Sequence, residues 1–387
     1  MSGNNFNARE AEQKHLLQVY AQFGFEPVSA AGVYITCRDG KRLLDLYGGH
    51  AVASLGYAHP DAIQALEEQA EKLFFQSNAV ALETRAAAAD KLIAAAPGTL
   101  NKVFLVNSGA EANENALRVA CKHTGRGKIL ALENGFHGRT AAAGAVTWGA
   151  KDNWYGFPQT PFEVGFIPRD DAGTAAGMID GDTAAVIIEL VQGVAGAYDL
   201  NKDYVRQIAE ACQQQGALLI VDEVQTGVGR SGMYFAAELY DLQPDLLTTA
   251  KALGGGFPCG ALLLTEELAK CMGNGDLGTT FGGGPLACAL INTVMDVIDR
   301  DHLLASVTKL SERIKQESIT GPVHKVSGHG FLLGLHCEGG AKPVREALLE
   351  QGILTGSSAD PNVIRLLPPL VLGDEHVDEF ITALKGL

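Results

Sequence analysis

Short apolar runs alternate with longer amphipathic stretches from Val103 onward, and this alternation limits the possible folds more than any other feature of the chain. The runs are KVFLV at 102–106, KILAL at 128–132, AVIIEL at 185–190, ALLIV at 217–221, LLTT at 246–249 and ALLL at 261–264. Most are unbroken, which predicts strands covered by helices on both faces. Residues 204–215 predict one such helix, with Gly216 at its C-cap. The middle of the chain is therefore predicted to be an α/β domain with a mostly parallel central sheet.

The two ends of the chain differ from this middle. Residues 33–46 predict a hairpin that turns at Asp39-Gly40, and long helical stretches after Pro285 precede short strands at 331–336 and 363–367. We predict a smaller α+β domain, built from the C-terminal part with the N-terminal segment packed near it. The expected boundaries are 1–46 for the N-terminal segment, 47–285 for the large domain and 286–387 for the small domain.

Composition excludes several classes of partner. The 30 basic and 45 acidic residues give a net charge of −15, which repels nucleic acid and anionic membrane surfaces. The seven cysteines form no C-x-x-C pair and the histidines show no metal-ligand spacing, so we expect free thiols, a reducing compartment and no metal site. Residues 1–14 lack the apolar core of a signal peptide, and no apolar run approaches the roughly 20 residues of a membrane span. We therefore expect a cytoplasmic protein.

Four polar clusters directly follow apolar runs: NSGA at 107–110, GFHGR at 135–139, DEVQ at 222–225 and AK at 250–251. Ligands of an open α/β sheet bind outside the carboxyl ends of its strands. One crevice is therefore expected to hold all four clusters.

Three of the four clusters have both a chemical and a structural interpretation. Ser108, Gly109 and Ala110 open a helix whose N–H groups suit a phosphate, or they form an ordinary helix cap. Asp222 is a buried carboxylate that needs a cation such as a protonated pyridine nitrogen, or it makes a structural ion pair. Lys251 follows an apolar strand, where loss of water favours the neutral nucleophilic amine, or it extends to the surface as most lysines do.

A G-x-G-x-x-G match at 227–232 is a weak indication of dinucleotide binding. The fingerprint needs its glycines in the turn between a strand and a helix, whereas five residues intervene here and no helix signal follows. No G-x-x-x-x-G-K-[ST] sequence occurs.

Taken together and in order, these motifs resemble the class III aminotransferases, which are fold-type-I pyridoxal-phosphate enzymes. The matching segments are NSGAEANENAL (107–117), FHGRT (136–140), IIELVQG (187–193), LIVDEVQTGVGRSG (219–232), AKALGGGFPCGA (250–261), GTTFGGGPLA (278–287) and VIRLLPPL (363–370). The resemblance implies bound pyridoxal 5'-phosphate. Lys251 would hold it as a Schiff base and move the proton, and Asp222 would pair with the ring nitrogen. The other cofactor contacts would be Ser108, Gly109 and Ala110 at the phosphate, Phe136 and Val224 on the two ring faces, Gln225 at the phenolic oxygen, and Thr280 reaching the phosphate from the partner subunit of a homodimer.

Within the class, DLYGGHAV (45–52), SNAV (77–80) and FHGRT resemble the acetylornithine aminotransferase branch, which acts in arginine biosynthesis. The QGV-x-G pattern (192–196) and the tail TGSS…NVIRLLPPL (355–370) resemble the succinylornithine aminotransferases in particular. The resemblance implies transfer of the terminal amino group of an N-acylornithine to 2-oxoglutarate, giving glutamate. Arg139 would bind the α-carboxylate of the acylornithine and Arg365 that of 2-oxoglutarate or glutamate, with Thr279 also in the substrate site. Val194 stands where many relatives have a Glu that neutralises this second arginine, which favours an N-acyl substrate over free ornithine. Acetyl and succinyl groups both remain open.

Two other functions stay open. Another ω-aminotransferase or a pyridoxal-phosphate aminomutase shares the same motifs, and dependence on 2-oxoglutarate separates the mutase. A non-catalytic nucleotide-binding protein would rest on the match at 227–232. Gly284 stands where relatives often have Asn, and no consequence follows from it.

Overall fold

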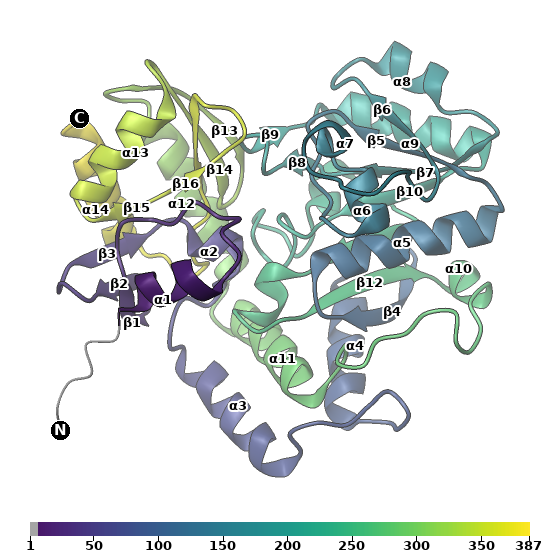
Figure 1. Ribbon diagram of the computed structural model, residues 1–387, viewed down its shortest axis with the longest axis horizontal. Helices are drawn as coiled ribbons and strands as arrows, with labels where there is room; N and C mark the ends of the chain where they lie inside the picture. The colour runs from purple at the N-terminus through teal and green to yellow at the C-terminus, as the bar shows by residue number, and fades with distance from the viewer. Residues whose placement is uncertain (1–6) are drawn as a thin grey trace.

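A seven-stranded sheet forms the centre of the larger part of the molecule in this computed structural model, which describes residues 7–387 (Figure 1). The strand order is β4-β12-β11-β10-β7-β5-β6. The strands are β4 (Leu100–Val106), β5 (Lys128–Leu132), β6 (Glu163–Ile167), β7 (Thr183–Ile188), β10 (Leu218–Asp222), β11 (Leu246–Thr249) and β12 (Gly260–Thr265). All neighbours are parallel except β12, which is antiparallel to both β11 and β4. The predicted mostly parallel sheet is confirmed.

Helices cover both faces of this sheet, which explains the unbroken apolar runs. In β5, Ile129 and Ala131 pack into one core cluster with α5 (Gly109–Thr124), whereas Leu130 and Leu132 pack into another with α8 (Ala172–Met178) and α9 (Lys202–Gln215). Neither side of residues 129–132 faces water, and all four of these residues are apolar. Gly216 ends α9 with a left-handed φ of 61°, as predicted for a C-cap.

Segments from both ends of the chain build the smaller part of the molecule, which lies at the left of Figure 1. One sheet has the order β13-β14-β17-β16 and another the order β1-β2-β3-β15, which joins the N-terminal hairpin to a C-terminal strand. These strands are β1 (Pro27–Ala31), β2 (Tyr34–Cys37), β3 (Arg42–Asp45), β13 (Val323–His329), β14 (Leu332–Cys337), β15 (Ile353–Leu354), β16 (Gly356–Ser357) and β17 (Val363–Leu366). The hairpin turns where predicted, with Gly40 at a φ of 86°.

The remaining elements connect these layers. They are α1 (Ala8–His15), α2 (Gly48–Ala51), α3 (Pro60–Lys72), α4 (Glu83–Ala95), α6 (Ala141–Ala145), α7 (Ala150–Asn153), β8 (Val191–Gln192), β9 (Tyr198–Asp199), η1 (Ala236–Tyr240), η2 (Lys251–Gly254), α10 (Glu266–Lys270), α11 (Pro285–Arg300), α12 (Leu303–Glu317), α13 (Ala341–Glu350) and α14 (Asp374–Lys385). Helix α11 packs against α3 and α4 as well as α12. The exact domain boundaries at 46 and 285 therefore stay a prediction, and residues 1–6 of the N-terminal segment lie outside the described residues.

None of the helices within 7–387 has both the length and the apolar character that crossing a membrane requires.

Candidate active site

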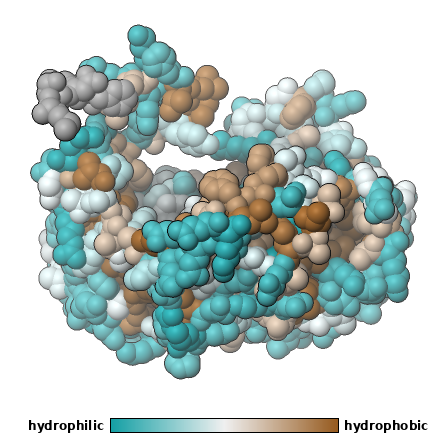
Figure 2. All heavy atoms as spheres, turned by 90° about the horizontal axis from the view of Figure 1, so that it is seen from below, coloured by the Kyte–Doolittle hydropathy of each residue, from teal (hydrophilic) through white to brown (hydrophobic). Residues whose placement is uncertain are grey.

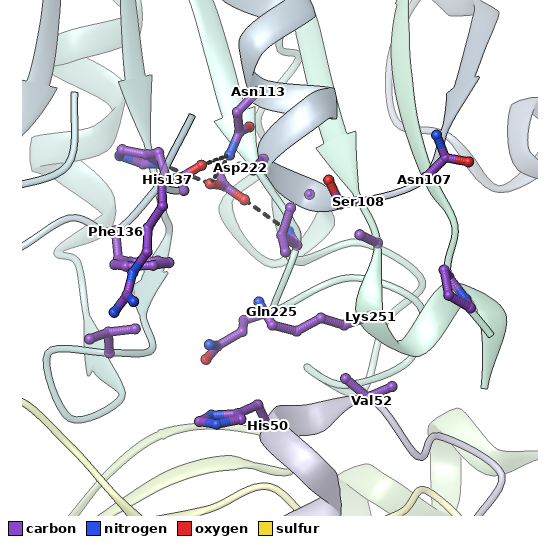
Figure 3. A pocket seen from close by; sticks show the side chains of 18 of the residues that line it. His50, Val52, Asn107, Ser108, Asn113, Phe136, His137, Asp222, Gln225 and Lys251 are labelled. Carbon is purple, nitrogen blue, oxygen red and sulfur yellow. Dashed lines mark hydrogen bonds and ion pairs between the residues drawn. The ribbon is translucent and has the colours of Figure 1, made fainter. Parts of the chain in front are cut away.

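A cavity of about 680 Å³ opens at the carboxyl ends of the parallel strands, where the larger and smaller parts of the molecule meet (Figure 3). All four polar clusters contribute to it, so the predicted single crevice is present. The sequence-predicted residues that line it are Ser108, Gly109, Ala110, Phe136, Arg139, Val194, Asp222, Val224, Gln225, Lys251 and Arg365. In Figure 3, Lys251 and Gln225 point into its centre, with His50 and Val52 facing them from another segment.

The start of α5 forms a tightly packed cradle. Ser108 caps the helix by accepting the N–H of Glu111 at 3.2 Å. A Cβ atom on Gly109 would lie 2.6 Å from Val224 Cγ1, and one on Gly260 would lie 2.7 Å from the Ser108 carbonyl oxygen. The first N–H groups of a helix have no partner within the helix, and its dipole favours an anion there. The cradle therefore has the chemistry of a phosphate site.

Asp222, 3% exposed, ends β10 and is held from several directions. Its Oδ2 accepts hydrogen bonds from Asn113 Nδ2 at 2.7 Å and His137 Nδ1 at 2.8 Å, both drawn in Figure 3, and its Oδ1 accepts from Val224 N at 3.0 Å. The Asn113 side chain is itself held in place, because the Thr248 hydroxyl donates to Asn113 Oδ1 at 2.6 Å. The carboxylate thus has one orientation, in which it can pair with a cation in the cavity.

Lys251 lies two residues beyond the end of β11, at the start of η2. Burial lowers the pKa of its amine, an effect that the nearby Asp222 and Glu189 carboxylates oppose and Arg365 reinforces. Its backbone has a φ of 42°, an unfavourable left-handed conformation for a residue with a side chain. A desolvated amine is the nucleophilic form of lysine, so the site is equipped to bond an aldehyde.

Glu189 is a buried carboxyl group to which the sequence assigned no role. It accepts hydrogen bonds from Phe136 N at 2.8 Å and Gly193 N at 3.2 Å, and burial raises its pKa to about 7. Beside it, the buried Gln225 Oε1 has no hydrogen-bond partner within residues 7–387. Gly193 leaves room for this amide, because a Cβ there would lie 1.9 Å from Gln225 Oε1. Gln225 therefore presents a free polar group to a ligand.

The two predicted substrate arginines have different surroundings. The exposed Arg139 guanidinium lies 5.3 Å from the ring centre of Trp154 and 6.0 Å from that of Phe136. Arg365 is 4% exposed, and its Nε donates to the Ser357 carbonyl at 2.6 Å. Its Nη1 is buried with no partner among the described residues, which leaves this cation a donor for a carboxylate.

His50 is a cavity residue that the sequence did not single out. It lies in α2, a turn in which Gly48, Gly49, His50 and Ala51 all have φ between 55° and 68°. Its Nε2 shares a hydrogen bond with the Tyr47 hydroxyl. Burial and the nearby Arg365 and Lys251 charges lower the pKa of His50 to about 4. The imidazole is therefore neutral at pH 7 and offers a polar contact without charge.

Two predicted residues lie outside the cavity lining. Thr279 accepts a hydrogen bond from Asn107 Nδ2 at 3.2 Å, next to the cradle. Thr280 is exposed, beside the exposed Phe281. Their roles with substrate and with the partner's phosphate stay predictions.

The glycine-rich match at 227–232 has a structural role. No helix begins there; the loop packs on the C-terminal part, with a Cβ on Gly232 falling 2.6 Å from Thr308 Oγ1 of α12. Arg230 is fully buried and donates to the Pro368 carbonyl. Nothing in this arrangement resembles a strand–turn–helix phosphate site.

Within 7–387, no cluster of side chains has the composition of a metal site.

Comparison with known proteins gives a consistent result. The family model described as "Aminotransferase class-III" matches residues 18–387. An acetylornithine aminotransferase of Methanopyrus kandleri is 40% identical over 384 residues, covering 98% of each chain. Among solved structures, an acetylornithine aminotransferase of Elizabethkingia anophelis superposes with a TM-score of 0.86 at 30% identity, covering 98% of this chain and 97% of the other. An ornithine aminotransferase of Toxoplasma gondii, with PLP at partial occupancy, superposes with a TM-score of 0.89 at 28% identity over 98% and 93%.

Proposed function

Because this chain belongs to the class-III aminotransferase family, a family of pyridoxal-phosphate-dependent transaminases, we propose that it transfers the terminal amino group of an N-acylornithine to 2-oxoglutarate. When bound, pyridoxal phosphate supplies an aldehyde that bonds to amines and a ring that withdraws electrons from the substrate carbon. The cavity residues fit this group: a helix N-terminus for its phosphate, a fixed carboxylate, a free buried amide oxygen and a desolvated amine.

Each polar group of the cavity has a proposed task. The N–H groups at Ser108, Gly109 and Ala110 hold the phosphate, and Asp222 keeps the ring nitrogen protonated by pairing with it. Lys251 would hold the cofactor through its amine, and the same amine would move the proton at the substrate carbon. The low pKa of this amine supports that task, since only the neutral form can accept a proton.

The observation that carries the substrate proposal is the wall around Arg365. Val194, the neutral His50 and the arginine line it together, and within the described lining the carboxyl groups are those of Asp222 and Glu189, which bond inside the protein. The free α-ammonium group of ornithine would gain no anionic partner at this wall and would be repelled by Arg365. An acylated nitrogen is uncharged, so Arg365 does not repel it, and its N–H can donate a hydrogen bond to a neutral imidazole.

A substrate panel tests the proposal. Ornithine, N-acetylornithine and N-succinylornithine are compared by kcat/KM with 2-oxoglutarate as acceptor, and we expect both acylated substrates to exceed ornithine by at least about tenfold, the equivalent of one lost charge-assisted contact. Preference for free ornithine would overturn the substrate assignment. Turnover without 2-oxoglutarate would instead indicate an aminomutase.

We also propose that the enzyme is a homodimer with shared active sites. Large apolar side chains lie exposed after α3 and before α11; Phe75 and Phe281 pack ring to ring at 5.5 Å, and Phe74 is 68% exposed. Figure 2 shows brown side chains gathered across the middle of the face seen from below, and Figure 1 places α3 at the bottom of the molecule. Exposed apolar surface of this kind favours a protein interface, and Thr280 lies beside it. Phe281→Asp should yield inactive monomers in sedimentation velocity; a fully active monomer would contradict the proposal.

A reducing, cytoplasmic setting is proposed from the thiols. All seven cysteines are free and five are buried, which is the pattern of cysteines used as small apolar residues. A thiol titration of the unfolded chain should find seven.

A further inference from the structure

Arg139 lacks the anchor that a carboxylate-binding arginine usually has. Within residues 7–387 its side chain makes neither a hydrogen bond nor an ion pair; its closest interactions are with the two aromatic rings at 5.3 and 6.0 Å. A guanidinium has five N–H donors that lie in its plane, whereas a π contact uses its flat face. Aromatic contacts can therefore hold this cation without occupying any donor.

The nearer ring, that of Trp154, comes from a separate segment with a defined position. Trp154 follows α7, and its backbone N–H donates to the Ala150 carbonyl at 2.9 Å. The indole packs toward α6, where a Cβ on Gly144 would lie 3.5 Å from Trp154 Cζ3 and 3.3 Å from the Tyr155 ring. The Tyr155 hydroxyl donates to the Ala141 carbonyl, which ties this segment to α6. Trp154 is 39% exposed, so part of the indole stays uncovered, and the Arg139 guanidinium carbon lies 5.3 Å from its ring centre.

We propose that Trp154 is a positioning residue for the amino donor: its indole holds the Arg139 guanidinium so that all of its N–H donors remain available to the substrate carboxylate. This inference rests on the proposed function in one respect, namely that Arg139 binds the carboxylate of the donor. The ring face also attracts the cation, which favours this position of the guanidinium. Trp154 thereby contributes to substrate binding without touching the reacting atoms.

The chain has two tryptophans, and the second is a matched control. Trp148 is 43% exposed, similar to Trp154, but it packs edge-on against Phe166 at 5.1 Å and not on Arg139. Trp154→Leu removes the aromatic ring beside Arg139, and Trp154→Phe keeps a smaller aromatic ring there. Trp148→Leu removes an indole of similar exposure that does not contact Arg139.

The assay uses the holoenzyme with two donors, N-acetylornithine and N-acetyl-1,4-diaminobutane, which has the same amine and acyl group but no carboxylate. Trp154→Leu should raise KM for N-acetylornithine about five- to tenfold, with kcat changed less than about twofold and kcat/KM for the diamine unchanged. Trp154→Phe should recover most of the loss, and Trp148→Leu should behave as wild type. An equal loss for both donors, or no loss for either, would overturn the proposal.

Fluorescence gives a readout that does not depend on turnover. In a Trp148→Phe background Trp154 is the sole tryptophan, and binding of N-acetylnorvaline, which has the carboxylate but no terminal amine, should change its emission. Arg139→Gln should remove this change. If the wild type uses no acylornithine, the proposed function fails, yet a titration with glutarate still tests Trp154; an emission indifferent to both carboxylates would refute its role.

Discussion

Gly109→Ala puts one methyl group into the most crowded contact of the phosphate cradle. The new Cβ would lie 2.6 Å from Val224 Cγ1 and 2.8 Å from Cγ2, up to 0.8 Å short of the 3.4 Å at which ordinary contact begins (3.4 − 2.6 = 0.8). Val224 is β-branched and cannot rotate a methyl group out of the way. Gly109 does not have a positive φ, so the cost comes from the contact and not from the backbone. Overpacking of this kind costs about 1–3 kcal/mol, which corresponds to about a 5- to 150-fold weaker cofactor complex.

Two measurements check this expectation, the dissociation constant of pyridoxal phosphate and the free energy of unfolding in urea. Val224→Ala removes both Cγ atoms and leaves its Cβ at 3.3 Å, so the double variant should recover part of the loss. The coupling in this double-mutant cycle should be at least about 1 kcal/mol. Wild-type cofactor affinity in Gly109→Ala, or zero coupling, would refute the reasoning.

Three further predictions concern the cavity. Burial raises the pKa of both Glu189 and Glu223 from 4.5 to about 7. Between these pH values the folded chain keeps protons that the unfolded chain releases, so the free energy of unfolding falls as pH rises from about 4.5 to 7. Glu189→Gln should make this fall smaller when the apoenzyme is unfolded in urea. Asn113→Ala removes one of the three hydrogen bonds to Asp222 and takes away the Asn113 partner of the Thr248 hydroxyl and the His137 carbonyl. This should cost about 1–3 kcal/mol of unfolding free energy, and wild-type stability would contradict the network. Lys251→Ala should lower turnover at least about 10³-fold while circular dichroism stays unchanged; persistent transamination would exclude its role.

The sequence predicts well those features that depend on strand ends. Asp222 is the last residue of β10, Lys251 lies two residues beyond β11, and Ser108 stands between β4 and α5. Since parallel strands end at the same edge of a sheet, an apolar run followed by a polar residue fixes both its element and its place in the cavity. The direction of the antiparallel β12 could not be predicted in this way, because its first residue, Gly260, and not its last, packs against the Ser108 carbonyl of the cradle.

Residues that reach the site from helix interiors or from distant segments have no such signal. Asn113 lies within α5, where no motif distinguishes it from other polar residues of a helix. Its burial depends on the packing of α5 over β10 and β11. His50 comes from a left-handed turn whose conformation no periodicity reveals. Trp154 lies 15 positions beyond Arg139, and the contact exists only because α6 and α7 fold back.

The two walls of the cavity differ in how much change they tolerate. Around the cradle, glycines adjoin other residues at contact distance, as Gly138 does with Ala110 and Gly260 with Ser108, so an added carbon atom has nowhere to go. On the wall around Arg365, the side chains of His50 and Val194 line the cavity itself, so a larger or smaller residue there changes mainly the shape of the cavity. Variants selected for a new amino donor should therefore accumulate on that second wall, while the first stays as it is.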